Sequence, residues 1–358
     1  MKETKNQLFI HPTDSCGLNC EFCVYADNRK KGKNFPHLDI EKGNAKISLQ
    51  NLMKGSQHVC FSGGGEPLLN TNMICEAMEL LDKKKFMITT GIGKSLEELE
   101  KDFEKINEAC KKHNSYCVIR VSVDSWHDKN NFDEKLEQIM KWFIDKRWEN
   151  CRTLFFRTSM IERKLFYKKM RKIMFKNRWI PIKKDINPIT SMMFLKKKMF
   201  MTLFRPMIYP FQYGGKDEYD TLSYIDLMLK IDSEEIYLGK PRSCRGCKGC
   251  NMWKSDMNNG LDITVNAKGD ITLYGAEISV LANIYDDVVT YDLLYERMKK
   301  YPEYEILHSV GIRRVMEEFL NDEFLGEKTR EISYPFAVIR ELMKKYPEEV
   351  LNVIRKIK

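Results

Sequence analysis

The sequence lacks any uncharged apolar run that approaches the length of a membrane span. Its first ten residues, MKETKNQLFI, also lack the apolar stretch that a signal peptide requires. There is no internal repeat and no low-complexity linker. A hydrophobic fraction of 43% can fill a core, which excludes a mostly disordered chain. The 358 residues suit one large domain, or a large domain with a small appendage.

The chain does not have the even number of cysteines that full disulfide pairing would require, since it contains 11. Disulfide frameworks belong to short secreted domains, and this chain is too long to need such cross-links. We therefore expect a cytoplasmic protein in a reducing compartment. Clustered cysteines in that setting indicate metal or redox chemistry.

Negative charge is scarce in one part of the chain. Residues 141–200 contain 18 Lys or Arg against 4 Asp or Glu, a local balance of +14 within a total of +9. Such a stretch can attract nucleic acid, phosphorylated ligands or acidic peptides. The alternative interpretation is the solvated outer face of helices.

Short apolar runs rich in β-formers alternate with helix-like segments through the first two-thirds of the chain. This alternation predicts six parallel βα units, which are too few for a full eight-stranded barrel. A partial barrel and an open parallel sheet both fit. The expected strands are 7–12, 58–62, 86–90, 116–123, 153–159 and 199–208, and the expected helices include 74–84, 95–112, 132–147 and 163–177.

The pattern changes near Gly239. Residues 261–274 indicate a β-hairpin with its turn around Lys268 and Gly269. From Tyr291 onward the sequence is helical in character.

Three cysteines directly follow the first expected strand, with the spacing C-x3-C-x2-C. Three thiolates on one tight loop can hold three irons of a [4Fe–4S] cluster and leave the fourth iron open to a ligand from solution. A structural zinc site normally needs four protein ligands, and no fourth Cys or His is near apart from His11. The three residues are Cys16, Cys20 and Cys23.

This loop, Cys16-Gly-Leu-Asn-Cys20-Glu-Phe22-Cys23, resembles the signature loop of the radical S-adenosylmethionine (SAM) superfamily. The resemblance implies that SAM chelates the open iron and that Phe22 lies beside its adenine. It also implies reductive cleavage of SAM to methionine and a 5′-deoxyadenosyl radical, which removes a substrate hydrogen atom. The family's fold is a partial (β/α)6 barrel of the TIM type, which agrees with the six units.

A glycine-rich segment follows the second expected strand. Ser62-Gly63-Gly64-Gly65-Glu66-Pro67 resembles the family's GGEP motif. Glycine permits close approach of the backbone to a ligand. By resemblance, Gly64 and Gly65 bind the SAM amino group, with Glu66 near the charge.

Three weaker matches follow at the ends of later strands, where barrel enzymes build their sites. Thr90, in Thr89-Thr90-Gly91, occupies the place of a TNG-like element. Ser122 belongs to an RxSxD-like pattern, Arg120 to Asp124, whose serine often touches SAM in the family. Arg157 on the fifth strand is a candidate for the SAM carboxylate. A turn, a capped strand end or a salt bridge would explain each residue equally simply.

A second group, Cys244, Cys247 and Cys250, has the spacing C-x2-C-x2-C with glycines between. It favours an auxiliary [4Fe–4S] cluster, and a zinc site is the main alternative. The hairpin that follows resembles the start of a SPASM or twitch extension. No cysteine follows Cys250, and Tyr274 stands near the place of the next expected ligand. The region can therefore hold one auxiliary cluster at most, with a fourth iron that is open or bound by Tyr274 or another residue.

The other five cysteines fall in expected strands or helices, where packing is the default interpretation. By resemblance, one of them could serve as a thiol hydrogen donor. They are Cys60, Cys75, Cys110, Cys117 and Cys151.

Together these patterns predict an α/β fold: a partial (β/α)6 barrel with a small C-terminal cysteine-rich β-hairpin and a helical extension. We expect a radical SAM core over 1–215, an auxiliary cluster region over 216–290 and a helical segment over 291–358. The preferred function is modification of a ribosomally made peptide by epimerisation, cross-linking or dehydrogenation. Alternatives are an aminosugar, a nucleoside or another small molecule, then RNA modification, and last a non-catalytic iron–sulfur or nucleic-acid-binding protein. The expected partners are the substrate and a reductant such as flavodoxin or ferredoxin, with nucleic acid less favoured and no membrane.

Overall fold

The computed structural model describes residues 6–18, 20, 35–125, 127, 131–145, 148–159, 162–187, 190–195, 198–205, 260–274, 278–330 and 335–357. The chain forms two compact units. The first unit combines 1–9, 41–59 and 207–358, and the second combines 10–40 and 60–206. No helix among the described residues is both long enough and apolar enough to cross a membrane.

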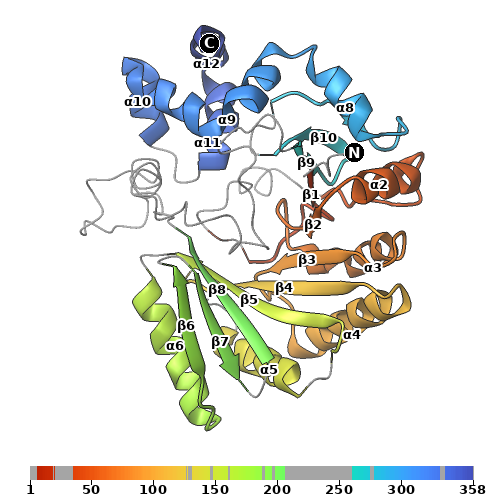
Figure 1. Cartoon of the computed structure of the whole chain (residues 1–358), viewed down its shortest axis with the longest axis vertical. Coiled ribbons are helices and arrows are strands. Elements are labelled where there is room, and N and C mark those ends of the chain that lie inside the picture. Colours follow the sequence, from red (N-terminus) through yellow and green to blue (C-terminus); the bar gives the residue numbers. More distant parts are fainter. Residues whose placement is uncertain are drawn as a thin grey trace. The chain divides into compact units, whose positions relative to one another are not determined.

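The second unit is built on a parallel sheet (Figure 1). Its strand order is β2-β3-β4-β5-β8-β7-β6, and β3, β4, β5 and β8 run parallel. All six strands expected from the sequence are present within a few residues. They are β1 (Gln7–Ile10), β2 (His58–Phe61), β3 (Lys85–Thr90), β4 (Tyr116–Ser122), β5 (Cys151–Ser159) and β8 (Lys198–Arg205).

Helices connect these parallel strands, as the alternation predicts. The helix before β4 begins with a capping box, in which the Ser95 hydroxyl accepts from the Glu98 amide and the Glu98 side chain returns to the Ser95 amide. The helix that follows β2 ends at Met78, whereas the sequence predicted an end at residue 84. The connecting helices are α3 (Thr71–Met78, after the 3₁₀ turn η1, Pro67–Asn70), α4 (Leu96–Lys112), α5 (Phe132–Ile144) and α6 (Arg163–Lys176). The result is a mixed α/β fold with a parallel sheet, consistent with the partial barrel of the expectation.

The two faces of the sheet differ in character. One face carries apolar side chains toward the helices, such as Phe156 on β5, whose ring lies 5.9 Å from that of Phe166 on α6. On the opposite face the register aligns Thr89 of β3 with Arg120 of β4, and Ser122 of β4 with Arg157 of β5. Side chains alternate along a strand, so these polar residues share one face.

A β-hairpin lies between α6 and β8, which the sequence did not predict. Strands β6 (Ile182–Asn187) and β7 (Thr190–Leu195) pair antiparallel, and β7 pairs antiparallel with β8. This hairpin and α6 carry nine of the 18 Lys or Arg of the basic stretch. Phe175 and Ile180 beside it are each 89% exposed.

The first unit joins the start of the chain to its C-terminal part. In it β1 pairs with β9 (Asp262–Val265), β9 pairs antiparallel with β10 (Asp270–Leu273), and β10 pairs with β11 (Ala282–Asn283). The Asn6 side chain accepts from the Leu261 amide at 2.8 Å and donates to the Gly55 carbonyl at 3.1 Å. The antiparallel pairing has its turn at Lys268 and Gly269, where the sequence placed it.

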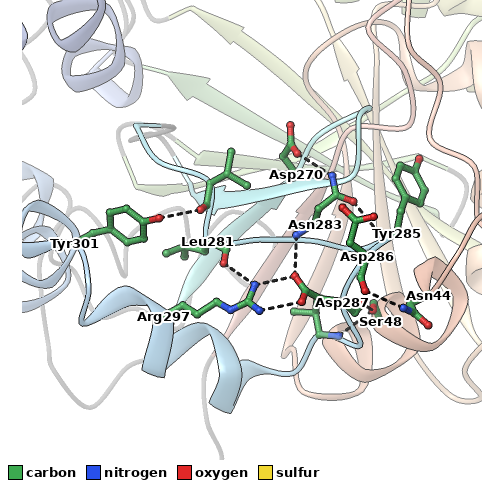
Figure 2. Close-up of polar contacts among 12 residues, drawn as sticks. Asn44, Ser48, Asp270, Leu281, Asn283, Tyr285, Asp286, Asp287, Arg297 and Tyr301 are labelled. Carbon is green, nitrogen blue, oxygen red and sulfur yellow. Dashed lines mark hydrogen bonds and ion pairs between the residues drawn. The ribbon is translucent and has the colours of Figure 1, made fainter.

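A polar network fastens the loop after β11 to two helices (Figure 2). Arg297 of α8 (Tyr291–Met298) forms a bidentate ion pair with Asp287, at 2.7 and 2.9 Å. The Ser48 hydroxyl of α2 (Ala45–Lys54) donates to the Asp287 carbonyl at 2.7 Å and accepts from the Val289 amide at 2.9 Å. The C-terminal helices α9 (Pro302–Asn321), α10 (Glu323–Arg330), α11 (Pro335–Lys345) and α12 (Pro347–Lys356) complete this unit, as the helical character of the sequence indicated.

The Glu137 carboxylate links α5 to α6, and its removal gives a prediction for stability. It accepts hydrogen bonds of 2.7 to 3.0 Å from Lys141, Lys176 and Asn177. Burial raises the pKa of Glu137, but these hydrogen bonds outweigh it and lower the pKa to about 2. Replacing Glu137 with Gln is expected to reduce the free energy of unfolding by about 1–2 kcal/mol at pH 7, since the lysine partners are partly solvated.

The sign of the pH dependence follows from the depressed pKa. The stabilisation is present above about pH 4.5, the ordinary value, and is lost as the pH falls toward 2. Chemical denaturation of both proteins should therefore give free energies that converge over that window. Glu134, an exposed residue of the same helix, is the matched control, and Glu134→Gln should change stability by less than about 0.5 kcal/mol. An equal effect of both variants at pH 7 would contradict the assignment.

Candidate active site

The first cysteine loop follows β1 and is held by backbone pairing with residues 36–38. The Asp14 amide donates to the Pro36 carbonyl at 3.1 Å, and the Leu38 amide donates to the Pro12 carbonyl at 2.9 Å. Cys16 is half-buried and Cys20 is buried. Cys23 and Phe22 lie outside the described residues, as do Cys244, Cys247 and Cys250. Among the residues that are described, no group of three potential ligands forms a complete metal site.

The glycine-rich segment packs directly on this cysteine loop. The Gly65 amide donates to the Thr13 carbonyl at 2.7 Å, and the Glu66 amide donates to the Ser15 carbonyl at 2.8 Å. Gly64 has a φ of +59°, and a Cβ there would lie 2.6 Å from Asp14 Oδ1. A Cβ on Gly65 would overlap the Ser15 carbonyl. The close approach of the two backbones therefore requires glycine at both positions.

Glu66 closes the junction between these loops and the end of β3. It is 4% exposed, and its carboxylate accepts from the Gly91 amide at 2.8 Å and the Leu68 amide at 3.3 Å. The Thr90 hydroxyl is a third hydrogen-bond partner. Burial raises the pKa of Glu66 in spite of these donors. Glu66 thus fixes the loops to one another, and its contact with a SAM amino group stays a prediction.

The polar face of the sheet carries candidate residues on β4 and β5. Arg120 is 4% exposed, and its Nε donates to Thr89 Oγ1 at 2.8 Å. Its Nη2 lies 3.8 Å from Cys60 Sγ on β2. Ser122 and Arg157 are register partners, and the Val123 amide donates to the Arg157 carbonyl at 2.8 Å. The candidate SAM residues on β4 and β5 are therefore neighbours, whereas Thr90 lies on the other face of β3 from Thr89.

A buried His–Asp pair lies at the end of β4, and sequence reasoning missed its histidine. His127 Nδ1 lies 2.6 Å from Asp124 Oδ1, and the ring also forms a hydrogen bond with the Cys20 side chain. Burial lowers the pKa of His127, but these two hydrogen bonds outweigh it and raise the pKa to about 10. A histidine three positions after the aspartate that ends a strand was the available signal.

The remaining cysteines that the structure describes are packed into the second unit. Burial raises the pKa of Cys75 and of Cys110 to about 12. It also raises the pKa values of Cys117 and Cys151 well above the ordinary thiol value. High pKa values keep thiols protonated and unreactive toward metals. In the first unit, the Tyr274 ring stacks on Phe9 with centroids 3.9 Å apart. Its contact with an auxiliary cluster stays a prediction, because all three cysteines of that group lie outside the described residues.

Comparison with known families agrees with this arrangement. Residues 10–155 match the family model described as the Radical SAM superfamily, a stretch that contains both the cysteine loop and the glycine-rich loop. The parallel fold, the paired loops and this match together indicate an enzyme with a radical SAM domain over residues 10–155. That family implies a [4Fe–4S] cluster and SAM as cofactors. The buried Cys20 thiol and the glycine cradle suit such a group.

Several curated proteins are similar to part of the chain. A "Probable dual-specificity RNA methyltransferase RlmN" of Christiangramia forsetii is 24% identical over 140 residues, which cover 36% of this chain and 40% of that protein. A protein of the same name from Flavobacterium psychrophilum is 22% identical over 153 residues, 39% of this chain and 44% of its own length. The "Dual-specificity RNA methyltransferase RlmN" of Buchnera aphidicola is 24% identical over 156 residues, or 40% and 42%. The chain therefore spans about two-fifths of the length of these relatives.

Proposed function

We propose that this protein reductively cleaves SAM to a 5′-deoxyadenosyl radical, which abstracts a hydrogen atom from a substrate. The observation that carries the proposal is the direct backbone pairing between residues 13–15 of the cysteine loop and residues 65–66 of the glycine-rich loop. In the superfamily these loops hold the cluster and SAM respectively. Their pairing here supports the proposal, because it joins the loops that follow β1 and β2.

The chain's own residues have distinct roles in this proposal. Cys16, Cys20 and Cys23 would hold three irons, and the bound cluster supplies the electron that cleaves SAM. Gly64 and Gly65 allow the glycine-rich loop to pack against the cysteine loop. By resemblance, they would bind the SAM amino group, and Phe22 would lie beside its adenine. Glu66 holds the glycine loop against the end of β3 through the Gly91 amide.

Two residues farther along the same edge complete the SAM site that we propose. Ser122 and Arg157 are register partners at the ends of β4 and β5, and Arg157 would pair with the SAM carboxylate. A guanidinium is suited to this role because it matches a carboxylate with two parallel hydrogen bonds.

The direct test of the function is a reaction without oxygen. The reconstituted protein, SAM and a strong reductant such as dithionite are incubated, and 5′-deoxyadenosine is measured by mass spectrometry. Its release at several turnovers is the expected result. No release from protein that contains a reducible [4Fe–4S] cluster would contradict the proposal.

The substrate that we propose is a ribosomally made peptide, with an aminosugar, a nucleoside or a similar small molecule as the alternative. Cys244, Cys247 and Cys250 would hold an auxiliary cluster that orients the substrate or carries an electron. A SPASM- or twitch-like extension of this kind fits enzymes that act on such molecules. Transfer of deuterium from a labelled peptide into 5′-deoxyadenosine would identify the substrate class.

RNA is the second candidate substrate, and a specific surface supports it. Helix α6 carries seven Lys or Arg and no acidic residue between Arg163 and Lys176. Phe175 and Ile180 at its C-terminal end are each 89% exposed. Basic and apolar groups together are typical of surfaces that bind the backbone and bases of single strands. The relatives named as RNA methyltransferases are consistent with this candidate.

If RNA is the substrate, reversing charge on α6 should weaken its binding. Lys164, Lys168 and Arg171 are exposed, and their joint replacement by Glu exchanges three positive charges for three negative ones. We expect at least a tenfold loss of affinity for single-stranded RNA at low salt and a smaller salt dependence, by about one unit of log–log slope per lost phosphate contact. The matched control reverses Lys101, Lys105 and Lys111, three exposed residues of α4. Equal loss in both triple variants would indicate a nonspecific charge effect and contradict an RNA site on α6.

A further inference from the structure

The loop after β4 holds His127 rigidly. The Asp124 carboxylate accepts from the His127 amide at 3.1 Å and lies 2.6 Å from its ring Nδ1. Both residues are 8% exposed. The aspartate therefore fixes the backbone and the ring of the same residue. An imidazole whose one nitrogen is hydrogen-bonded to a carboxylate has a fixed orientation, and its other nitrogen can form a second hydrogen bond.

The other contact of the ring is the Cys20 side chain. A hydrogen bond joins His127 to Cys20, across 107 positions of sequence. Gly91 makes room for this contact, because a Cβ there would lie 2.7 Å from His127 Cδ2 and would overlap Leu18. Cys20 is 6% exposed, so few water molecules can reach its sulfur. The histidine is therefore a polar group that the fold places at this buried sulfur.

A hydrogen bond to a cluster sulfur has a defined electrostatic effect. A [4Fe–4S] cluster gains one negative charge when it takes one electron from the external reductant. An N–H donor stabilises the more negative state more strongly, and hydrogen bonds to the sulfurs are among the factors that set cluster potentials. Burial strengthens the effect because the local dielectric constant is low.

We propose that His127 is a positioning residue that donates a hydrogen bond to the sulfur of Cys20 and so raises the reduction potential of the cluster bound there. The inference rests on the proposed function, since it requires that Cys16, Cys20 and Cys23 hold the cluster. Asp124 orients the ring, and Gly91 leaves the space for it. His127 is not itself a ligand in this proposal, and its role is in setting how readily the electron enters.

The test measures the reduction potential of the cluster rather than the activity of the enzyme. Wild type, His127→Leu and His127→Gln are reconstituted without oxygen, and the midpoint potential is determined by EPR-monitored titration in the absence of SAM. His127→Leu removes the donor and should lower the ratio of reduced to oxidised cluster about tenfold at a fixed potential, which is 59 mV for one electron. His127→Gln retains an amide N–H and should fall between the two.

A second His–Asp pair provides the matched control. His113 Nδ1 lies 2.9 Å from Asp82 Oδ1, just before β4 begins, at the end of the strand opposite to Asp124. His113→Leu should leave the midpoint potential unchanged. A shift in this variant equal to that of His127→Leu would show that loss of any histidine has the effect, and would overturn the proposal.

The remaining outcomes are also decisive. Equal potentials in wild type and His127→Leu, with the same cluster content, would overturn the role of His127. If the Leu variant fails to take up iron, His127→Asn replaces it. Asn has the same side-chain amide as Gln, but its side chain is shorter, so the amide lies farther from the Cys20 sulfur. Equal potentials of the Asn and Gln variants would then overturn the proposal. A wild-type protein that binds no reducible cluster would instead contradict the proposed function.

Discussion

Replacing Cys20 with alanine is expected to abolish both cluster binding and SAM cleavage. Cys20 is buried, and alanine offers no ligand to iron. Two thiolates cannot retain a [4Fe–4S] cluster that is assembled on three. Iron per chain and 5′-deoxyadenosine should both fall to background, while circular dichroism should show a folded protein, because a buried Cys→Ala change costs about 1 kcal/mol.

Two other cysteine variants make this result specific. Cys75 of α3 is half-buried and belongs to none of the proposed clusters, so Cys75→Ala should retain iron and SAM cleavage. Cys247→Ala should spare uncoupled SAM cleavage but lose product, because it removes a ligand of the proposed auxiliary cluster alone. Full release of 5′-deoxyadenosine by the Cys20 variant would exclude this residue as a ligand. Full product formation without Cys247 would refute a catalytic auxiliary cluster.

Replacing Gly65 with alanine is expected to separate the two loops of the site. The new Cβ would overlap the Ser15 carbonyl, a backbone atom that cannot move without its loop. The hydrogen bonds from Gly65 to Thr13 and from Glu66 to Ser15 must then lengthen or break. We expect a loss of about 2–3 kcal/mol in the free energy of unfolding of the iron-free protein, and at least tenfold weaker binding of SAM after reconstitution.

Gly93 is the matched control for this change. A Cβ there would lie 3.2 Å from Cγ of Leu18, a flexible side chain that can shift by a few tenths of an ångström. Gly93→Ala should therefore alter stability by less than about 1 kcal/mol. Chemical denaturation measures both variants, and isothermal titration measures SAM binding. Wild-type stability of the Gly65 variant would mean that the loops pair less closely than their hydrogen bonds indicate.

The parallel strands were predictable because each is a short apolar run next to a segment whose apolar residues recur with the period of a helix. Helix α2 was missed since its N-cap residue, Asn44, makes no side-chain cap bond and no acidic residue stands in its first turn. Its stability depends instead on packing in the first unit, where Ser48 bonds Asp287 and Val289. Strand β6 was missed because Lys183, Lys184 and Asp185 break the apolar run expected of a buried strand, and it lies at the sheet edge.

Those parts of the site that consist of a single motif on a single loop were predictable. Contacts between residues far apart in the sequence were not. The glycines and the cysteine trio are local patterns, so the sequence identified both loops. The pairing of Gly65 with Thr13, and the contact of His127 with Cys20, join residues separated by 52 and 107 positions. Local periodicity contains no information on such pairs. Glu66 was assigned to SAM by resemblance, but the contacts that it makes within the chain required coordinates.

The composition of the first unit has a consequence for synthesis of the protein on the ribosome. Asn6 is held by Leu261, 255 positions later, and Ser48 of α2 by residues 287 and 289. Residues 6–9 and 41–59 therefore lack these C-terminal partners until nearly the whole chain has emerged. The second unit contains no residue beyond 206, so all of its residues emerge before the C-terminal partners of the first unit. The loops that would carry the cluster can thus mature before the first unit is complete.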